Sequence, residues 1–439
     1  MAEKQNIRSL ALSLLCRMEA AGQYANIALD TAVHRADVQD SDRALLTVLL
    51  YGVTERKITL DYIIDSLSSV PPSKIERTTR NILRMGLYQL IFLDRVPSHA
   101  AVSESVNLAS KRSKAFVNAL LREFLRKDKK FDLPDREKDN LLYLSVKYSV
   151  PTELCGLFSD IFGTERTESL FAAMNKNPTL TLRTNTEKIT RDKLLSLLNE
   201  AGIRATATSY SSFGINLAEN IPYSSVPGAK EGLWHVQDEA SQICTEICGV
   251  KPGDTVIDAC SCPGGKSFSL AELMNNKGRI YSFDLHENKL SLVRCGAERL
   301  GINIIETAEK DGRIFDMSLS EHADAVLCDV PCSGLGVLAK KPEIRYKPIE
   351  TTLRLPEIQY EIAENCLRYV KVGGALIYST CTLLPRENEE VVRRLLSAHP
   401  ELETTDFELS SLRSKDGMLT LYPDVHGFDG FFIAKLRKK

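Results

Sequence analysis

From residue 234 onward, short apolar segments alternate with amphipathic ones, and this alternation limits the possible folds more than any other feature of the chain. The apolar segments include DTVIDA, RIYSFD, DAVLCDV and GALIYST, and helical patterns such as HENKLSLVRCGAERLG and PEIQYEIAENCLRYV lie between them. Apolar strands that alternate with helices are typical of a parallel sheet covered by helices on both faces. The sequence therefore predicts a doubly wound α/β domain over residues 233–439.

The front of the chain carries helical patterns instead, with few strand signals over residues 1–130. Apolar residues recur at helical spacing from Ile7 to Met18, which favours a first amphipathic helix over a signal peptide. These residues hold 20 Lys and Arg against 14 Asp and Glu, although the whole chain has a formal net charge of -2. A basic front indicates contact with a polyanion such as RNA, and a solvated helical face is the alternative. The basic residues collect late in this part: Lys111, Arg112, Lys114, Arg122, Arg126, Lys127, Lys129 and Lys130.

Residues 131–232 connect these two parts. A charged stretch and a helical pair are followed, from the segment PTLTLRTN onward, by the pattern strand, helix, strand, strand. This pattern predicts a small α/β unit of ferredoxin-like type. Arg183 and Asn185 in this unit, and Gln237 and Asp238 just after it, are weaker candidates for the RNA side or for the wall of a site.

Composition excludes several classes of protein. No apolar run reaches the roughly 20 residues that a membrane-spanning helix requires, so no membrane partner is expected. The 11 cysteines form no C-x-x-C pair and the seven histidines no H-x-x-x-H pair. This pattern predicts reduced thiols in a cytoplasmic protein and no metal site. Several cysteines are expected to fill cores as small apolar residues: Cys16, Cys155, Cys244, Cys295, Cys328 and Cys366.

The turn CSCPGGKS at residues 260–267 follows the apolar segment DTVIDA. A phosphate-binding loop needs a glycine where Cys260 stands, so a loop of that kind is the weaker alternative. Glycines in the first turn of a doubly wound fold still let a ligand approach the backbone and the free amides of the next helix. Asp284 lies 20 residues after Gly264, where an acidic residue takes ribose hydroxyls, although it could instead cap the next helix. The spacing favours a cofactor that contains a nucleoside.

Two cysteines follow strands that should be neighbours in the sheet. Cys332 ends the segment DVPC after one predicted strand, and Cys381 ends STC after the next. In the common strand order 3-2-1-4-5, the carboxyl ends of strands one, four and five meet over the cofactor. A thiolate that adds to C6 of cytosine makes C5 nucleophilic toward a methyl sulfonium. The pair therefore indicates covalent chemistry on a pyrimidine.

The motifs DACSCPGGK, DVPCSGLGV and YSTCTLLPRENE, taken in this order, resemble those of the S-adenosylmethionine-dependent RNA (cytosine-C5) methyltransferases. The front segment GLYQLIFLDRVPSHAAVSESVNLA, followed by FVNALLREFLR, resembles the NusB-like all-helical RNA-binding domain. Together they imply a NusB-like domain, a ferredoxin-like connector and a Rossmann-like catalytic domain. The implied activity is methyl transfer from S-adenosylmethionine to C5 of one cytosine in 16S ribosomal RNA, and we expect the enzyme to be a monomer.

The resemblance also implies roles for single residues. Asp284 would hold ribose hydroxyls, Asp311 would approach adenine, and Asp329 would face the reaction centre. The methionine end of the cofactor would be lined by one continuous segment: Cys260, Ser261, Cys262, Pro263, Gly264, Gly265 and Lys266.

In this family the thiol at Cys381 would attack C6, and the thiol at Cys332 would assist release of the product. Related DNA enzymes use the cysteine after proline as the nucleophile, so this choice rests on the resemblance alone. Cys262 departs from the small residues that often precede Pro263, and we expect it to pack as serine or alanine would.

Three questions stay open at the level of sequence. Lys266 could meet the cofactor carboxylate, an RNA phosphate or a neighbouring aspartate. The segment LAKKPEIRYK could track RNA phosphates and stack a base on Tyr346, with a solvated loop as the alternative. A rival function is an RNA-binding assembly factor whose C-terminal domain binds the cofactor without catalysis.

Overall fold

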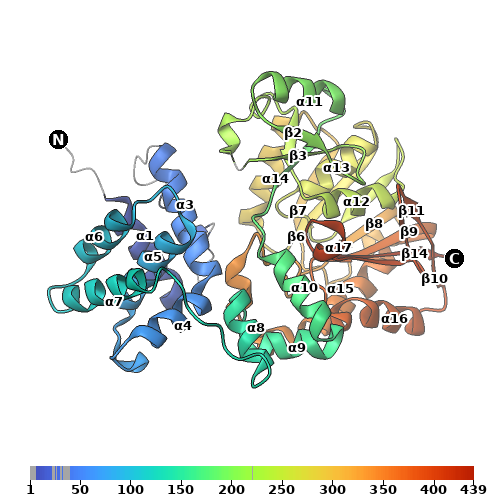
Figure 1. Cartoon of the computed structure of the whole chain (residues 1–439). Helices are drawn as coiled ribbons and strands as arrows, with labels where there is room; N and C mark the ends of the chain where they lie inside the picture. Colours follow the sequence, from blue (N-terminus) through green and yellow to red (C-terminus); the bar gives the residue numbers. More distant parts are fainter. Residues whose placement is uncertain (1–5, 22–24, 26, 30–31, 33–39, 220) are drawn as a thin grey trace. The chain divides into compact units, whose positions relative to one another are not determined.

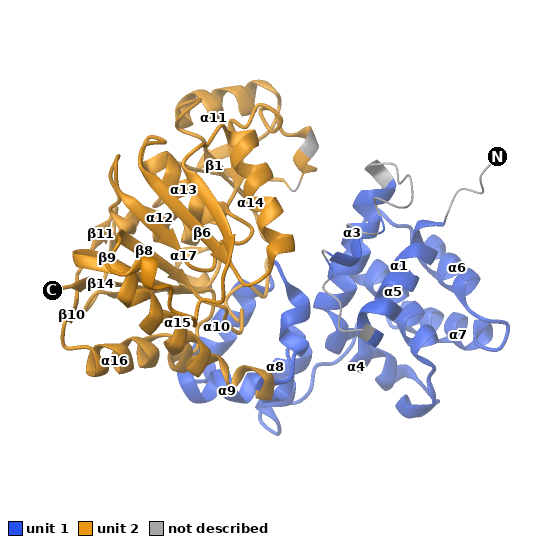
Figure 2. Ribbon diagram, turned by 180° about the vertical axis from the view of Figure 1, so that it is seen from behind, with its two compact units in different colours: residues 1–175, 340–349 blue, residues 176–339, 350–439 orange. Residues whose placement is uncertain are grey.

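The computed structural model describes residues 6–21, 25, 27–29, 32, 40–219 and 221–439 of the chain. The chain divides into two compact units, shown in separate colours in Figure 2. The first unit comprises residues 1–175 and 340–349, and the second comprises residues 176–339 and 350–439. The domain boundaries that the sequence suggests after residues 130 and 232 stay predictions beside this division.

The first unit is built from helices, as the sequence predicts (Figure 1). In α7 (Lys114–Arg126), the apolar residues at helical spacing from Val117 to Phe124 are buried in the core of the unit. The eight basic residues late in this part are all exposed. The other helices of the unit are α1 (Ile7–Ala21), α3 (Asp40–Glu55), α4 (Lys57–Leu67), α5 (Arg77–Phe92), α6 (Ser98–Leu108), α8 (Asn140–Tyr148), α9 (Thr152–Phe162) and α10 (Thr164–Met174).

Residues 340–349 belong to the first unit and contain a short 3-10 helix, η4 (Pro342–Tyr346). Arg345 is only 1% exposed, and the hydroxyl group of Tyr346 donates to the backbone oxygen of Thr54 at 2.8 Å. The Nη1 atom of Arg345 lies 3.2 to 3.3 Å from four oxygen atoms: the backbone oxygens of Glu55, Tyr148 and Ser149 and Oδ1 of Asn175. The suggestion that Tyr346 stacks an RNA base is therefore wrong, because these two side chains are held inside the unit.

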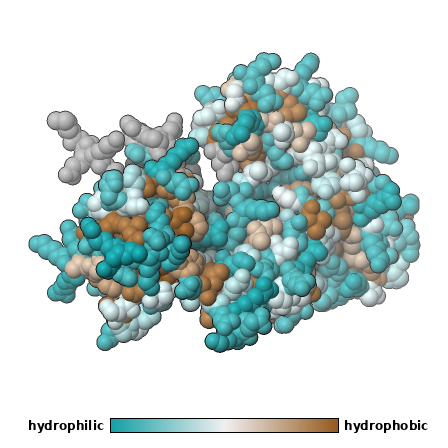
Figure 3. Space-filling model, viewed as in Figure 1, coloured by the Kyte–Doolittle hydropathy of each residue, from teal (hydrophilic) through white to brown (hydrophobic). Residues whose placement is uncertain are grey.

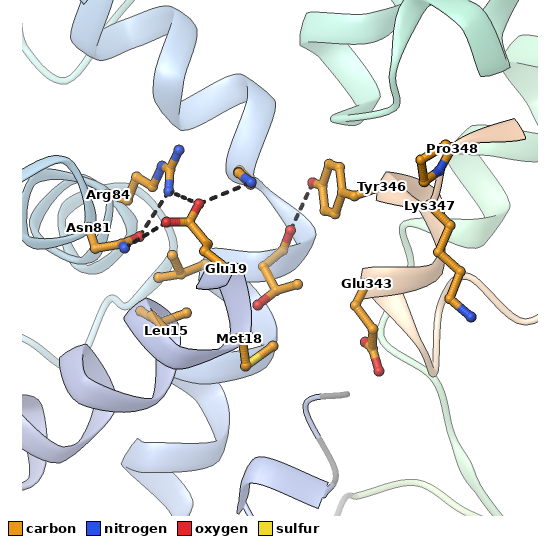
Figure 4. Close-up of a pocket in the computed structure, with 12 residues that line it drawn as sticks. Leu15, Met18, Glu19, Asn81, Arg84, Glu343, Tyr346, Lys347 and Pro348 are labelled. Atoms are coloured by element: carbon orange, nitrogen blue, oxygen red, sulfur yellow. Dashed lines mark hydrogen bonds and ion pairs between the residues drawn. The ribbon is translucent and has the colours of Figure 1, made fainter. Parts of the chain in front are cut away.

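A cavity of about 310 Å³ lies beside Tyr346 and is lined by charged groups (Figure 4). Glu19 accepts hydrogen bonds from Arg84 at 2.6 Å, and the ammonium group of Lys57 lies 3.0 Å from the same carboxylate. Burial opposes the charged form of Glu19, but Arg84 and Lys57 outweigh it and lower the pKa of Glu19 to about 2. The negative charge of Glu19 is therefore compensated by these two basic side chains.

Replacing Arg345 by methionine is expected to lower the free energy of unfolding of the first unit by about 2 to 4 kcal/mol. The reason is that buried carbonyl groups then lose their donor. Urea unfolding of the full chain, followed by circular dichroism, measures this loss. Lys341→Met, at an exposed neighbour, serves as the control and should leave the curve unchanged. Equal midpoints for Arg345→Met and the unchanged protein would contradict the anchoring role.

The second unit begins with the small α/β sheet that the sequence predicts. Its strands are β1 (Leu180–Thr184), β2 (Ala205–Ala207), β3 (Gly214–Leu217) and β4 (Trp234–Val236), with α11 (Arg191–Glu200) beside them. The strand order is β2-β3-β1-β4, and every pairing is antiparallel. Trp234, the first residue of β4, is fully buried in the core of this sheet. β4 therefore belongs to the small sheet, although it lies just past the boundary predicted after residue 232.

The large sheet of the second unit has the order β10-β14-β9-β8-β5-β6-β7, and β13 pairs with β14. Five neighbouring strands at one end of this order, β9-β8-β5-β6-β7, are parallel, as predicted. The C-terminal strands run antiparallel and were not predicted. The strands are β5 (Thr255–Asp258), β6 (Arg279–Asp284), β7 (Ile305–Glu309), β8 (Ala323–Asp329), β9 (Val370–Thr380), β10 (Leu402–Thr404), β13 (Met418–Leu421) and β14 (Phe431–Lys438).

Helices cover both faces of this sheet. One face packs on α15 (Leu355–Tyr369) and α16 (Glu389–Ala398). The other face packs on α12 (Glu239–Cys248), α13 (Gly265–Leu273) and α14 (Glu287–Leu300). A short hairpin of β11 (Glu408–Leu409) and β12 (Leu412–Arg413) and the one-turn helix α17 (Pro423–His426) complete the unit. The carboxyl ends of β5, β8 and β9 therefore meet at one edge.

The burial of side chains agrees with most expectations from the sequence. Cys155, Cys244, Cys328 and Cys366 are buried as predicted, whereas Cys295 is exposed, so its assignment as a core residue was wrong. On the face seen in Figure 3, apolar residues gather in separate patches between hydrophilic ones. No helix among the residues that the structure describes is long and apolar enough to cross a membrane.

Candidate active site

Two cysteine side chains meet where β8 and β9 end. The Sγ atoms of Cys332 and Cys381 lie 3.2 Å apart, and both residues are half-buried. The parallel register of the two strands causes this, because Asp329 is paired with Ser379 just before the cysteines. The backbone N–H group of Gly336 also donates to the carbonyl oxygen of Cys381 at 2.9 Å. The structure thus brings together the two thiols that the strand order predicted to be close.

The thiol of Cys332 is strongly disposed to keep its proton. Its hydrogen bond with the Cys381 sulfur and its burial raise the pKa of Cys332 well above the usual range. The neighbouring carboxylate of Glu387 acts in the same direction. Both causes favour the protonated form of Cys332, and either of the two sulfur atoms can be the donor of the hydrogen bond between them.

Asp329, three residues before Cys332 in the chain, forms an ion pair with Lys266. The Nζ atom of Lys266 lies 2.8 Å from Oδ2 of Asp329, and the hydroxyl group of Ser379 donates to Oδ1 at 2.7 Å. Burial opposes the charge of Lys266, but Asp329 outweighs it and raises the pKa of Lys266. Of the three partners considered for Lys266, the structure shows the neighbouring aspartate.

The glycine turn joins β5 to the first turn of α13. Gly264 has a φ angle of +109°, and a Cβ atom there would lie 2.5 Å from the ring of Phe268. The turn is closed by hydrogen bonds of 2.7 Å from Ser261 N to Phe283 O and from Gly264 N to Ser261 O. Glycine is thus required at position 264 both by conformation and by space.

A cavity of about 180 Å³ lies against this turn. Most of the residues predicted to bind the cofactor line it, together with Asp258 of β5 and four residues between the end of β4 and the first turn of α12. The lining residues are Val236, Gln237, Asp238, Ser241, Asp258, Cys260, Ser261, Cys262, Pro263, Gly265, Lys266 and Asp329. The prediction of Gln237 and Asp238 as wall residues is therefore confirmed.

Asp284 and Asp311 lie outside this lining. Asp284 ends β6, and its Oδ1 atom accepts a hydrogen bond from the backbone N–H group of His286 at 3.0 Å. It does not cap α14, for which no side-chain cap is formed. Asp311 pairs with Arg313 at 2.6 Å, which lowers the pKa of Asp311. Asp284 is thus the last residue of β6 and Asp311 follows the neighbouring strand β7, and neither contributes to the wall of the cavity.

Several buried polar atoms of the cavity wall have no hydrogen-bond partner among the described residues. They are Oδ1 of Asp258, Oγ of Ser261 and Nε2 of Gln237. Such atoms are costly to bury unless a ligand or water completes their hydrogen bonds. Burial also raises the pKa of Asp258 to about 7. The wall therefore offers hydrogen-bond donors and acceptors suited to a ligand that carries one positive and one negative group.

Asp258 should make the stability of the protein depend on pH. Its pKa of about 7 lies above the ordinary value of 3.8. Between about pH 4 and pH 7 the folded protein keeps a proton that the unfolded chain has lost, so stability falls as the pH rises. Urea unfolding from pH 5 to pH 8 should show a smaller fall for Asp258→Asn than for the unchanged protein. The exposed Asp132→Asn variant is the control, and an equal fall in all three proteins would contradict this assignment.

Two predicted RNA contacts are wrong. Arg183 is fully buried and lies 2.8 Å from the carboxylate of Glu272. Asn185 is also fully buried and donates to the backbone oxygens of Gly232 and Leu300. Both side chains stabilise the small sheet and its neighbours rather than facing RNA.

Cys262 lines the cavity, and its apolar neighbours are those of the core beneath it. Burial, and then Asp284, raise the pKa of Cys262 to about 12, so it is an unreactive thiol. Ser241, Asp258 and Ser379 were not predicted. The motif STC contained a signal for Ser379, whereas nothing in the sequence marked Ser241.

Three family models match consecutive parts of the chain. Residues 247–437 match the family described as 16S rRNA methyltransferase RsmB/F. Residues 5–126 match the NusB family, and residues 152–224 match the ferredoxin-like domain of RsmF/B-like methyltransferases. The helices from α1 to α7 fall within the first of the three ranges along the chain, strands β1 to β3 of the small sheet within the second and strands β5 to β13 within the third, whereas β4 lies between the second and the third.

Bacterial relatives are similar over the whole chain. A probable ribosomal RNA small subunit methyltransferase B of Synechocystis sp. is 37% identical over 444 residues, covering 98% of this chain and 99% of the relative. The protein of the same description from Bacillus subtilis is 34% identical and covers 100% of both chains. The ribosomal RNA small subunit methyltransferase B of Escherichia coli is 30% identical over 449 residues, again covering 100% of both.

Solved structures show the same arrangement of elements. The crystal structure of PH0851 has a TM-score of 0.81 and 28% identity, covering 99% of this chain and all of the other. A methyltransferase homologue from Pyrococcus horikoshii has a TM-score of 0.61 and 30% identity, covering 69% of this chain and 99% of the other.

The cavity at the glycine turn fits the methyl donor of such enzymes. S-adenosylmethionine carries an ammonium group and a carboxylate at its methionine end, and the buried acceptor of Asp258 and the donors of Ser261 and Gln237 offer partners for both. The close-packed backbone at Gly264 allows the ligand to approach the start of α13. From the fold, the site and the similarity along its full length, the chain belongs to the 16S rRNA methyltransferase RsmB/F family and depends on S-adenosylmethionine.

Proposed function

We propose that the protein methylates C5 of one cytosine in 16S ribosomal RNA, at a site of the position-967 type, through a covalent adduct between a cysteine and C6. The observation that carries this proposal is the 3.2 Å separation of the Cys332 and Cys381 sulfur atoms beside the Lys266–Asp329 pair. Two thiols at adjacent strand ends, next to a methyl donor, suit nucleophilic catalysis on a pyrimidine.

Cys381 acts as the nucleophile in this scheme. After its proton passes to solvent, the thiolate forms a bond to C6, and the electron pair of the C5–C6 double bond moves onto C5. When bound, S-adenosylmethionine would supply the methyl group to which C5 forms its new bond, and the donor sulfur would keep the electron pair of the broken S–CH3 bond. The C5 proton then leaves to water, the double bond reforms, and the Cys381 thiolate departs with the electrons of the S–C6 bond.

Cys332 assists this departure. Its raised pKa keeps the proton on its sulfur, so its S–H group can donate a hydrogen bond to the leaving sulfur of Cys381. The thiolate is thereby stabilised as the methylated base is released. This role needs a protonated thiol, whereas the attacking residue needs a thiolate.

The ion pair of Lys266 and Asp329 has a positioning role. Both oxygen atoms of Asp329 are already engaged, one by Lys266 and the other by Ser379. We propose that this fixed pair holds the cavity wall next to Cys332 and Cys381. The segment 260–266 would hold the methionine end of the cofactor, Asp284 the ribose hydroxyls and Asp311 the adenine.

The eight exposed basic residues in and beside α7 are proposed to bind the RNA. The lysines and arginines at the turn before α7 and after its end are exposed, and phosphate contacts account for most RNA affinity. The target cytosine must leave its stack to reach the two thiols, which costs a few kcal/mol. RNA contacts remote from the reaction would help to offset that cost.

The direct experiment combines purified protein, S-adenosylmethionine and unmethylated 16S rRNA, followed by mapping of 5-methylcytosine. Loss of one such mark in cells that lack the protein should be restored in the purified reaction. Binding of the cofactor without any methyl transfer to rRNA would favour the assembly-factor alternative. A rise in melting temperature with ATP, rather than with S-adenosylmethionine, would favour a phosphate-binding loop.

A further inference from the structure

Gln237 brings a buried amide from the small sheet into the cavity of the catalytic domain. It directly follows β4, lines the cavity and is only 6% exposed. Its backbone is fixed on both sides, because its N–H group donates to Thr181 O at 3.1 Å and its carbonyl oxygen accepts from Gln242 Nε2 at 3.0 Å. The side chain therefore starts from a fixed point, and a substitution there need not move the strand.

One end of the Gln237 amide is held and the other is not. The hydroxyl group of Ser269, on α13, lies 2.8 Å from Oε1 of Gln237. The Nε2 atom has no partner among the residues that the structure describes, and it lies 3.7 Å from the place where a Cβ atom of Gly265 would be. A buried N–H donor thus faces the glycine turn and lacks an acceptor for its hydrogen bond.

We propose that Gln237 donates a hydrogen bond to the amino-acid carboxylate of S-adenosylmethionine. The neighbouring unpaired Oδ1 atom of Asp258 is an acceptor and suits the ammonium group of the same ligand end. The carboxylates expected to meet ribose and adenine, Asp284 and Asp311, follow β6 and β7 and lie outside this cavity. The donor of Gln237 is therefore placed for the methionine end.

This inference rests on the cofactor of the proposed function and not on the identity of the methylated base. The small sheet would then have a part in cofactor binding besides any contact with RNA. An oxygen atom of the target cytosine is the competing acceptor, and a binding experiment without RNA separates the two.

The test uses calorimetric titration of the full-length protein with S-adenosylmethionine and with its decarboxylated form, which differ only in the carboxylate. For Gln237→Leu, the affinity for S-adenosylmethionine should fall about 10- to 100-fold, the effect of losing a hydrogen bond to a charged group. The affinity for the decarboxylated ligand should stay within about twofold. Gln237→Glu keeps the shape of the side chain but places a carboxylate near the ligand's own, so the loss for S-adenosylmethionine should be larger still.

Ser269→Ala is the matched control for orientation, and it should lower the affinity for S-adenosylmethionine less than Gln237→Leu does. Melting temperatures without ligand verify that each variant is folded. Equal losses for both ligands, or no loss for S-adenosylmethionine, would overturn the inference while leaving the proposed methyl transfer intact. Failure of the unchanged protein to bind S-adenosylmethionine would overturn both. A variant that binds the cofactor normally but needs more RNA for half-maximal rate would assign Gln237 to the base instead.

Discussion

Replacing Cys381 by alanine is expected to lower the rate of methyl transfer to 16S rRNA by about 1,000-fold or more. Without the Cys381 thiolate to add to C6, C5 of cytosine stays a poor nucleophile, and in this scheme the nearby Cys332 thiol keeps its proton and does not replace it. The binding of S-adenosylmethionine should be nearly unchanged, because Cys381 is not among the residues that line the cofactor cavity. The rate is measured with labelled methyl groups under single-turnover conditions.

Cys295→Ala is the natural control for this experiment, since that thiol is exposed on α14. It should retain the full rate, which separates the loss of one particular sulfur from a general effect of cysteine substitution. Cys381→Ser should be nearly as inactive as Cys381→Ala, because a hydroxyl group ionises far less readily than a thiol. A rate within tenfold of the unchanged protein in either Cys381 variant would remove this residue as the nucleophile.

The second large effect is expected from Cys332→Ala. This variant keeps the attacking thiol but lacks the S–H donor that lies 3.2 Å from it. Addition to C6 and methylation of C5 should still occur, whereas departure of the Cys381 sulfur should become slow. RNA should therefore accumulate as a covalent adduct, seen as a band that survives denaturing electrophoresis, while turnover falls by about 100-fold or more.

The double variant that lacks both thiols provides the control, because it should form no adduct. The opposite result is equally clear. If Cys332 attacks C6, as in the related DNA enzymes, Cys332→Ala would form no adduct and Cys381→Ala could accumulate one. These two outcomes show which of the two cysteines attacks C6, a choice that the sequence supports only through its resemblance to a known family.

Much of the catalytic domain could be predicted because its pattern is local and repeated. Each parallel strand is a short apolar run followed by a helix, so the order of strands and the meeting of their ends followed from general rules. That is why Cys332, Cys381 and the glycine turn could be placed around one crevice. The observed contact of the two sulfur atoms agrees with that reasoning.

The remaining parts depended on contacts that a sequence does not display. A basic residue looks the same in a sequence whether it faces solvent or is buried beside carbonyl or carboxylate oxygens, which is why RNA contacts were wrongly predicted for Arg183 and for the segment that contains Arg345. The C-terminal strand β14 lies antiparallel beside β9, although the two are far apart in the sequence. It is not part of the repeated pattern of strand and helix that predicts the parallel strands. The apolar segment GFFIAKL does carry a strand signal that could have been used.

The central claim is that the Cys381 sulfur forms a bond to C6 of the target cytosine. It is tested most directly with 16S rRNA that carries 5-fluorocytidine, because fluorine at C5 cannot leave as a proton does. The protein should then be trapped on the RNA, and after digestion with trypsin and nuclease the nucleotide should remain on the peptide 372–386, whose single cysteine is Cys381. A nucleotide found instead on the peptide 314–340, which contains Cys332, or no adduct at all, would contradict the account.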